Sequence, residues 1–150
     1  MKTQIKNIIG KIWASPMTII GLVVGSVLTL VSKLIGRGGS AEIANNAITF
    51  TCGLDCGGSI TLGNVIIHAG RGVDTWNKDS TTTRYDRNGY VNLGKHEEAH
   101  TYQYEKYGVL MIPILLGSAI KNGGLREPTF HNFMAKSNLE KAADDYAQFT

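Results

Sequence analysis

The sequence has few cysteines and only a small excess of positive charge, and each of these shortages argues against certain classes of protein. Its 150 residues include two cysteines and three prolines, with a net charge of +3. Two cysteines cannot build a disulfide-rich scaffold or a four-cysteine zinc site. A basic excess this small, without a run of Arg and Lys, argues against a nucleic-acid partner. We therefore expect a single domain over residues 1–150 with an apolar core.

The two cysteines lie close together in the segment TCGLDCGG. Cys52 and Cys56 are separated by three residues, and a glycine follows each of them. A tight loop of this kind can bring the two sulfurs close enough for a disulfide, which indicates an oxidising compartment. Two alternatives stay open: reduced and buried thiols, or a metal site completed by two remote ligands.

The longest uncharged stretch covers residues 12–32 and is rich in aliphatic side chains. Its length reaches the threshold for a membrane-spanning helix. Ser15 is a suitable N-cap and Pro16 suits the first helical position, so we expect a helix that begins there and ends near Gly36. The apolar helix over residues 12–36 fits three placements: in or on a membrane, in a buried core, or in a secretory signal. Basic residues flank the stretch at Lys2, Lys6, Lys11, Lys33 and Arg37.

Small and weakly polar residues recur along this stretch at intervals of three and four, which places them on one helical face. Such a stripe lets another backbone approach closely. It suits either a helix partner in a bilayer or a packed neighbour in a soluble core. The stripe consists of Thr18, Gly21, Gly25, Thr29 and Ser32.

The pattern of residues in the middle of the chain predicts β-structure. Apolar and β-branched residues on both sides of a glycine-rich turn predict a β-hairpin with arms at residues 47–52 and 59–68. We expect His68, at the end of the second arm, to be a structural histidine. The polar segment that follows, residues 70–94, contains Asn88-Gly89 and predicts a surface loop or a second short hairpin.

The segment KHEEAHTYQYEKYG, residues 95–108, contains a His-Glu-x-x-His motif. His96 and His100 are four residues apart, so on a helix both imidazoles project from one face and can grip one ion. Glu97 is placed to take a proton from a water molecule that the ion activates. Neutral imidazoles suit Zn²⁺. The motif therefore predicts a hydrolytic zinc site, although a polar helix that binds nothing is the simpler alternative.

A catalytic zinc site usually has three protein ligands, so a third must come from elsewhere in the chain. We expect Glu140, because it shares a helical face with Asp144 beside an apolar stripe. Asp144 would then accept the free N–H of a ligating histidine and fix its tautomer. In the competing interpretation, Glu140 forms a capping box with Ser137 and only satisfies a backbone donor. The candidates considered for the third ligand are Glu127, His131, Glu140, Asp144 and Asp145.

Several segments resemble small bacterial HExxH proteins and the C-terminal toxin domains of Rhs-type polymorphic toxins and secretion-system effectors. They are SPMTIIGLVVG, NNAITF, ITLGNVII, HEEAHTYQYEKYGVLMIPILL and SNLEKAAD, in that order, and they cover most of the chain. The most specific part is His-Glu-x-x-His-x-x-Gln, which ends at Gln103. Asn64 departs from the resemblance, because such sequences often carry a histidine there. The metzincin pattern is excluded, since Gln103 and Lys106 stand where it needs Gly and a third His.

The resemblance implies an α+β, zincin-like fold in which the motif helix and a C-terminal ligand helix pack with a small hairpin or sheet, beside the apolar N-terminal helix. Residues 45–150 would form the metal-site core, with Gln103 lining the site or anchoring its helix. It implies a zinc metallopeptidase that acts as a secreted or delivered bacterial effector on a protein or peptide substrate. An immunity protein, a membrane contact and a periplasmic site of action go with that role.

Two other functions fit the same residues. The segment YGVLMIPILLGSAIKNGG, residues 107–124, is too short to span a bilayer easily and is interrupted by Pro113, so we expect it to be buried or interfacial. Together with the first helix, it raises the alternative of a membrane-acting toxin or membrane-anchored interaction module with a structural metal. Hydrolysis of a cell-wall amide is a third reading. The oxyanion stabiliser is open among Tyr102, Tyr104, Tyr146, His68 and His131.

Overall fold

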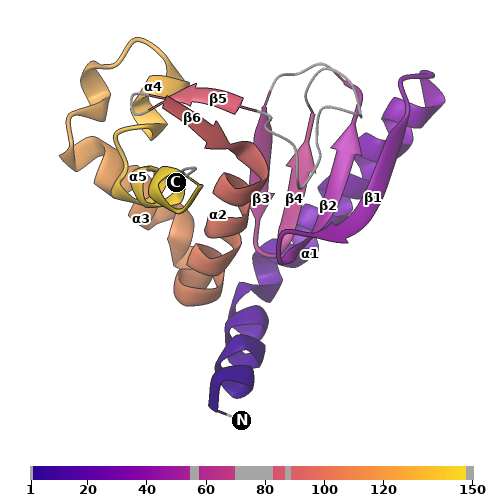
Figure 1. The fold of residues 1–150 in the computed structure, drawn as a ribbon, viewed down its shortest axis with the longest axis horizontal. Helices are drawn as coiled ribbons and strands as arrows, with labels where there is room; N and C mark the ends of the chain where they lie inside the picture. The colour runs from indigo at the N-terminus through magenta and orange to yellow at the C-terminus, as the bar shows by residue number, and fades with distance from the viewer. Residues whose placement is uncertain (1, 55–57, 70–82, 87–88, 148–150) are drawn as a thin grey trace.

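The computed structural model describes residues 2–54, 58–69, 83–86 and 89–147, and they form an α+β fold, as expected. A four-stranded mixed sheet lies beside a long N-terminal helix, and a two-stranded sheet lies beside the C-terminal helices (Figure 1). The helices are α1 (Lys2–Leu34), α2 (Leu93–Tyr107), α3 (Met111–Lys121), α4 (Phe130–Met134) and α5 (Asn138–Ala147), with 3-10 turns η2 (Gly108–Leu110) and η3 (Gly124–Arg126). The strands are β1 (Gly39–Ala44), β2 (Ala47–Cys52), β3 (Ser59–Leu62), β4 (Val65–His68), β5 (Thr83–Asp86) and β6 (Gly89–Asn92).

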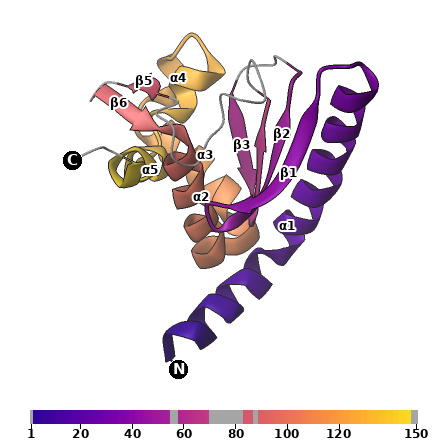
Figure 2. The same ribbon diagram turned by 45° about the vertical axis from the view of Figure 1, so that its right-hand side comes forward.

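Helix α1 is confirmed as an apolar N-terminal helix, but its predicted start at Ser15 is wrong. The helix begins at Lys2, and Pro16 lies inside it. A proline within a helix removes one hydrogen bond and bends the axis, and Figure 2 shows the change of direction along α1. The turns before Pro16 are held by tertiary packing, because Ala14 is fully buried in a cluster with Tyr104 of α2. The expected end near Gly36 is confirmed: α1 ends at Leu34, and Gly36 takes a left-handed φ of 73°.

The predicted hairpin of residues 47–52 with 59–68 is wrong, although both segments are extended. Residues 59–68 form a hairpin by themselves, in which β3 pairs antiparallel with β4 around a turn at Gly63. Strand β2 pairs antiparallel with β1 and parallel with β4, so the sheet order is β1-β2-β4-β3. The turn between β1 and β2 is Asn45-Asn46, with φ values of 52° and 55°, the conformation that a two-residue hairpin loop requires. The hairpins of this sheet therefore form around its two-residue turns, and not around the glycine-rich segment that follows Cys52.

The later segments match their expectations more closely. Strands β5 and β6 form the second short hairpin, with Asp86 paired to Gly89; Asn88 lies outside the described residues. The segment at 107–124 is partly buried. It is divided by the 3-10 turn η2, and within α3 only Met111, Leu115 and Ala119 are buried. Pro113 stands in the first turn of α3, where a missing N–H costs little.

The cysteine segment is described only in part. Cys52 is a buried free thiol on β2, and its sulfur lies 3.5 Å from the hydroxyl of Thr29 on α1. For this residue the reduced, buried alternative is therefore the one observed. Cys56 lies outside the described residues.

The stripe of small residues on α1 faces the four-stranded sheet. A Cβ atom added at Gly21 would lie 2.8 Å from Cβ of Val65 and 2.9 Å from the carbonyl oxygen of Leu62. At Ser32, the hydroxyl accepts a hydrogen bond from the backbone N–H of Gly53 at 3.0 Å. The stripe thus brings the helix axis close to the strands.

We expect Gly21→Ala to lower the free energy of unfolding by about 1–3 kcal/mol, because the methyl group overlaps backbone and side-chain atoms of the sheet. The gain in helix propensity, about 1 kcal/mol, does not offset that overlap. The matched control is Gly117→Ala in α3, where an added Cβ meets nothing within 4 Å and stability should hold or rise. Urea unfolding midpoints of the two variants measure the contrast. Equal stability of both would mean that α1 is not seated on the sheet.

Candidate metal centre

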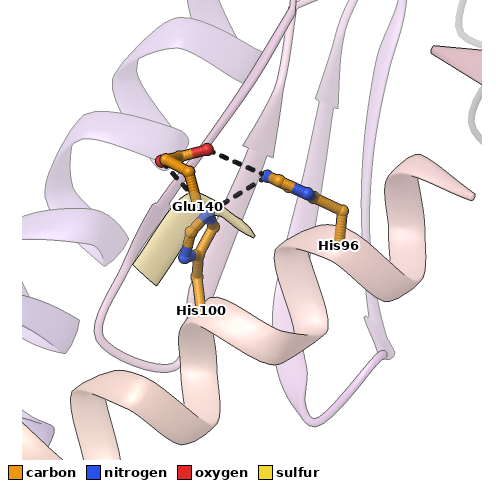
Figure 3. A group of neighbouring side chains, drawn as sticks. All are labelled: His96, His100 and Glu140. Carbon is orange, nitrogen blue, oxygen red and sulfur yellow. Dashed lines mark hydrogen bonds and ion pairs between the residues drawn. The ribbon is translucent and has the colours of Figure 1, made fainter. Parts of the chain in front are cut away.

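Three of the predicted ligands meet between helices α2 and α5. Both histidines, His96 and His100, project from one face of α2, and Glu140 reaches them from the first turn of α5 (Figure 3). The Nε2 atoms of the two histidines are 3.1 Å apart. The carboxylate of Glu140 places one oxygen 3.4 Å from Nε2 of His96 and the other 3.5 Å from Nε2 of His100. One possible ligand atom from each residue therefore lies within 4.8 Å of the others.

These separations match those within a zinc coordination sphere. Zinc binds nitrogen and carboxylate oxygen at about 2.0–2.2 Å in tetrahedral geometry, so two of its ligand atoms lie about 3.3–3.5 Å apart. The 3.1–3.5 Å separations among the two nitrogens and the carboxylate oxygens fall close to that value. The cluster can hold a metal ion with little rearrangement.

The outer nitrogen of each histidine has an acceptor, which fixes the tautomer of the neutral ring. Nδ1 of His96 lies 2.7 Å from Oδ1 of Asp144, and Nδ1 of His100 lies 2.9 Å from Oε1 of Gln103. The Gln103 amide is oriented by its own N–H, which donates to the carbonyl of Leu139 at 2.9 Å. A neutral ring with its proton on Nδ1 leaves the Nε2 lone pair bare. Two lone pairs and a carboxylate then face one another, and only a cation or added protons can hold them together.

Without a metal ion, protons take that role, as the electrostatics show. Burial lowers the pKa of His96, but hydrogen bonds to Asp144 and Glu140, with the charge of Glu97, outweigh it and raise the pKa to about 9. Burial also lowers the pKa of His100, and Glu140 and Glu97 raise it above its ordinary value. Burial raises the pKa of Glu140, but the two histidines hold it well below its usual range. The site is thus built to attract positive charge.

Glu97 is buried on α2, beside the edge strand β3. The hydroxyl of Thr61 donates to Oε2 of Glu97 at 2.6 Å, which leaves the other carboxylate oxygen able to accept a proton. Glu97 directly follows His96 on α2, and its charge raises the pKa of both His96 and His100. Sequence reasoning missed Thr61, because nothing local in SITLGN indicates that β3 packs on the motif helix.

The remaining candidates lie elsewhere. His68 is buried on β4, where Nδ1 lies 2.8 Å from the Ser59 hydroxyl, and burial lowers its pKa although Glu97 opposes the shift. That environment fits the expected structural histidine. Tyr104 belongs to the apolar core, and Glu127 pairs with Lys136 at 2.7 Å. Asp145 is exposed, Tyr102 and Tyr146 donate to Glu98, and the side chain of His131 lies outside the described residues.

The capping-box interpretation of Glu140 does not hold. Ser137 does cap α5, because its hydroxyl accepts a hydrogen bond from the N–H of Leu139 at 3.1 Å. Its own N–H, however, donates to the carbonyl of Met134 rather than to Glu140. The Glu140 carboxylate is therefore left for the histidines.

A second polar cluster, also missed from the sequence, joins α2 to α1 and the sheet. Oε1 of Glu105 accepts hydrogen bonds from Asn46 and Asn64, each at 2.9 Å, and pairs with Lys11 at 3.1 Å. Asn64 also donates to the carbonyl of Asn46 at 3.3 Å. Asn64, which departs from the resemblance, thus links the turn of one hairpin to the turn of the other and to the motif helix.

We expect Asp144→Asn to weaken zinc binding by about 10–100-fold, the usual effect of removing a carboxylate behind a ligating histidine. The amide oxygen can still accept from Nδ1 of His96, but it supplies no charge. Asp145→Asn, at the next and exposed position of α5, is the control and should leave affinity unchanged. Competition with a chromogenic chelator gives both dissociation constants. Equal affinities would show that Asp144 does not support the ligand.

Comparison with known proteins adds no relative: no protein-family model, no curated protein and no solved structure matches this chain.

Proposed function

We propose that the protein is a zinc-dependent metallopeptidase with a zincin-like fold, in which His96, His100 and Glu140 bind the metal. The observation that carries this proposal is the convergence of two imidazole lone pairs and one carboxylate at metal-ligand separations, with a buried glutamate beside them. A purely structural ion pair would not require both histidines to turn their Nε2 atoms toward the same carboxylate. The resemblance of the motif segment to HExxH proteins supports the same proposal.

The residues around the ligands divide the work of hydrolysis. Bound zinc would supply Lewis acidity, which polarises a peptide carbonyl and lowers the pKa of a water molecule toward about 7. Glu97 would take the proton from that water and deliver it to the leaving amine. Thr61 holds the Glu97 carboxylate, and Asp144 and Gln103 hold the histidine rings. Every titratable group in this scheme is buried or partly buried, which strengthens its electrostatic effect.

The biological role proposed with this chemistry is that of a bacterial effector or toxin, delivered or secreted to a protein or peptide substrate. Its support is the resemblance alone. A toxin of this kind requires a neutralising immunity protein in the cell that makes it.

The direct test combines elemental analysis with a search for cleavage products. Zinc-loaded protein is incubated with peptides from a digested bacterial proteome, and new termini are identified by mass spectrometry. We expect one zinc per chain, a consistent set of cleavage sites, loss of cleavage with a chelator and recovery on adding zinc. Stoichiometric zinc with no cleavage of any peptide would contradict the peptidase and favour a structural metal or another amide substrate.

One observation favours a second candidate, the membrane-acting or membrane-anchored module with a structural metal. Helix α1 exposes many large aliphatic side chains, among them Ile19, Val23 and Val27. Leakage of dye from vesicles separates the two functions. Leakage that is unchanged in Glu97→Gln would assign toxicity to the apolar segments rather than to hydrolysis.

A further inference from the structure

Helix α1 turns its small residues toward the sheet, with Leu22 and Leu28 beside them, and most of its other large aliphatic residues outward. Gly21 and Gly25 face the sheet, whereas the exposed side chains form what we call the outer face. Only 28% of the most apolar 18-residue stretch of α1 is buried, so α1 is not an ordinary core helix. The outer face consists of Ile8, Ile9, Ile12, Ile19, Ile20, Val23, Val24, Val27, Leu30, Val31 and Leu34.

The segment Ile8–Leu34 is long and apolar enough to cross a membrane, but the sheet argues against a crossing. All four strands β1 to β4 contact α1, and Figure 2 shows the sheet running beside the second half of the helix. A crossing would bury the open edges of that sheet in hydrocarbon, together with exposed polar residues such as Glu42 on β1. Open sheet edges do not occur in the lipid core. If α1 contacts lipid, it does so with its outer face alone.

The width of the outer face favours lipid over a second copy of the chain. At 100° per residue, its side chains cover about half of the helix circumference, whereas packing on another helix uses a stripe about 100° wide. The small-residue seam that would bring two helices together is already occupied by the sheet. Lipid chains, in contrast, can cover a broad convex face from every direction.

Charge supports the same partner. Residues 12–32 contain no charged side chain, whereas Lys33 in the last turn of α1 and Arg37 just after the helix are both exposed. At the other end of the stretch, Lys11 is exposed but pairs with Glu105. The chain carries a net charge of +3. An apolar face bounded by basic side chains fits a bilayer with anionic headgroups, where the charges remain in the headgroup layer.

We propose that α1 lies flat in the surface of an anionic bilayer, with its outer face at the acyl-chain boundary and the rest of the chain in water. This proposal does not depend on the metal centre or on peptide hydrolysis. It predicts that the full-length chain binds vesicles of phosphatidylcholine with phosphatidylglycerol more strongly than vesicles of phosphatidylcholine alone.

Flotation of the full chain with these two vesicle types tests the contact. The double variant Val23→Asp and Val27→Asp should lower partitioning by about tenfold or more, because two charges enter the acyl boundary. Leu125→Asp changes an exposed leucine on η3 and should float like the wild type. Equal flotation of the double variant and the wild type would overturn the proposal. So would a dimer in vesicle-free solution that the double variant abolishes, because the occupant would then be a second copy.

Depth measurements distinguish a flat helix from a spanning one. Residues Ile12, Val23 and Leu34 are spaced by eleven, close to three full turns, and lie along one line of the outer face. Each is replaced by tryptophan in a background that carries Trp13→Phe and Trp76→Phe, and quenching by lipids brominated at different acyl positions gives its depth. We expect the same shallow depth at all three positions. A deep centre with shallow ends would overturn the flat orientation.

Discussion

Glu97→Gln is expected to lower kcat/KM for peptide cleavage by about 10²–10⁴-fold while zinc stays bound, the range that general acid–base catalysis contributes. Glutamine has nearly the shape of glutamate, and its amide oxygen can still accept the hydrogen bond from Thr61. It cannot take a proton from water. Because His96, His100 and Glu140 are unchanged, zinc content by elemental analysis should equal that of the wild type. Kinetics on the most readily cleaved peptide of the library measure the loss.

Glu98→Gln is the matched control, one position further along α2. The Glu98 carboxylate accepts hydrogen bonds from the hydroxyls of Tyr102 at 3.1 Å and Tyr146 at 3.4 Å, on an exposed part of the helix. It is neither a proposed ligand nor the proposed base, so activity should stay within about twofold of the wild type. Full activity of Glu97→Gln with zinc bound would remove Glu97 from the role of base. An equal loss in both variants would point to a disturbed helix instead.

The elements that the sequence predicts well are those with a strong local period or cap. The length of the uncharged stretch and the glycine after it predicted α1 and its end, and the β-branched run predicted β2 at the residues that the structure shows. The pairing of the strands was wrong, because two short turns, Asn45-Asn46 and Gly63-Asn64, form local hairpins while β2 and β4 pair across a longer connection. The start of α1 was wrong for a similar reason. Packing of Ala14 on α2 carries the helix through Pro16, and local propensity contains no information on that contact.

The same distinction applies to the candidate site, where residues that share a helical face could be predicted and a contact between distant segments could not. Helical spacing predicts that His96 and His100 share a face, and the shared face of Glu140 and Asp144 on a second helix pointed to the groups that meet them. Thr61 could not be found in this way, because its contact with Glu97 joins β3 to α2 over 36 positions of sequence. A polar side chain on an edge strand has many equivalent partners until the fold is known. Residues that support a site from another element therefore need the structure.

Glu140→Ala is expected to weaken zinc binding by more than a hundredfold, because it removes one of the three proposed ligands and the only carboxylate among them. The effect should exceed the 10–100-fold that is typical of groups behind the ligands. Asp145→Ala, on the same helix but exposed, should bind zinc like the wild type. Isothermal titration in the presence of a competing chelator gives both affinities. Unchanged affinity in Glu140→Ala would place the third ligand elsewhere and end the proposed coordination.

The pH dependence of zinc binding follows from the same cluster. In the metal-free protein the pKa of His96 is raised to about 9, above its unfolded value of 6.5, so its proton stabilises the fold fully below pH 6.5 and less as pH rises toward 9. Zinc must displace that proton, so affinity should rise by up to about tenfold per pH unit over this window for each proton released. The increase in Tm caused by zinc should therefore grow between pH 6.5 and 9, while Tm of the metal-free protein falls. A zinc affinity that is flat across the window would mean that the ion binds without His96.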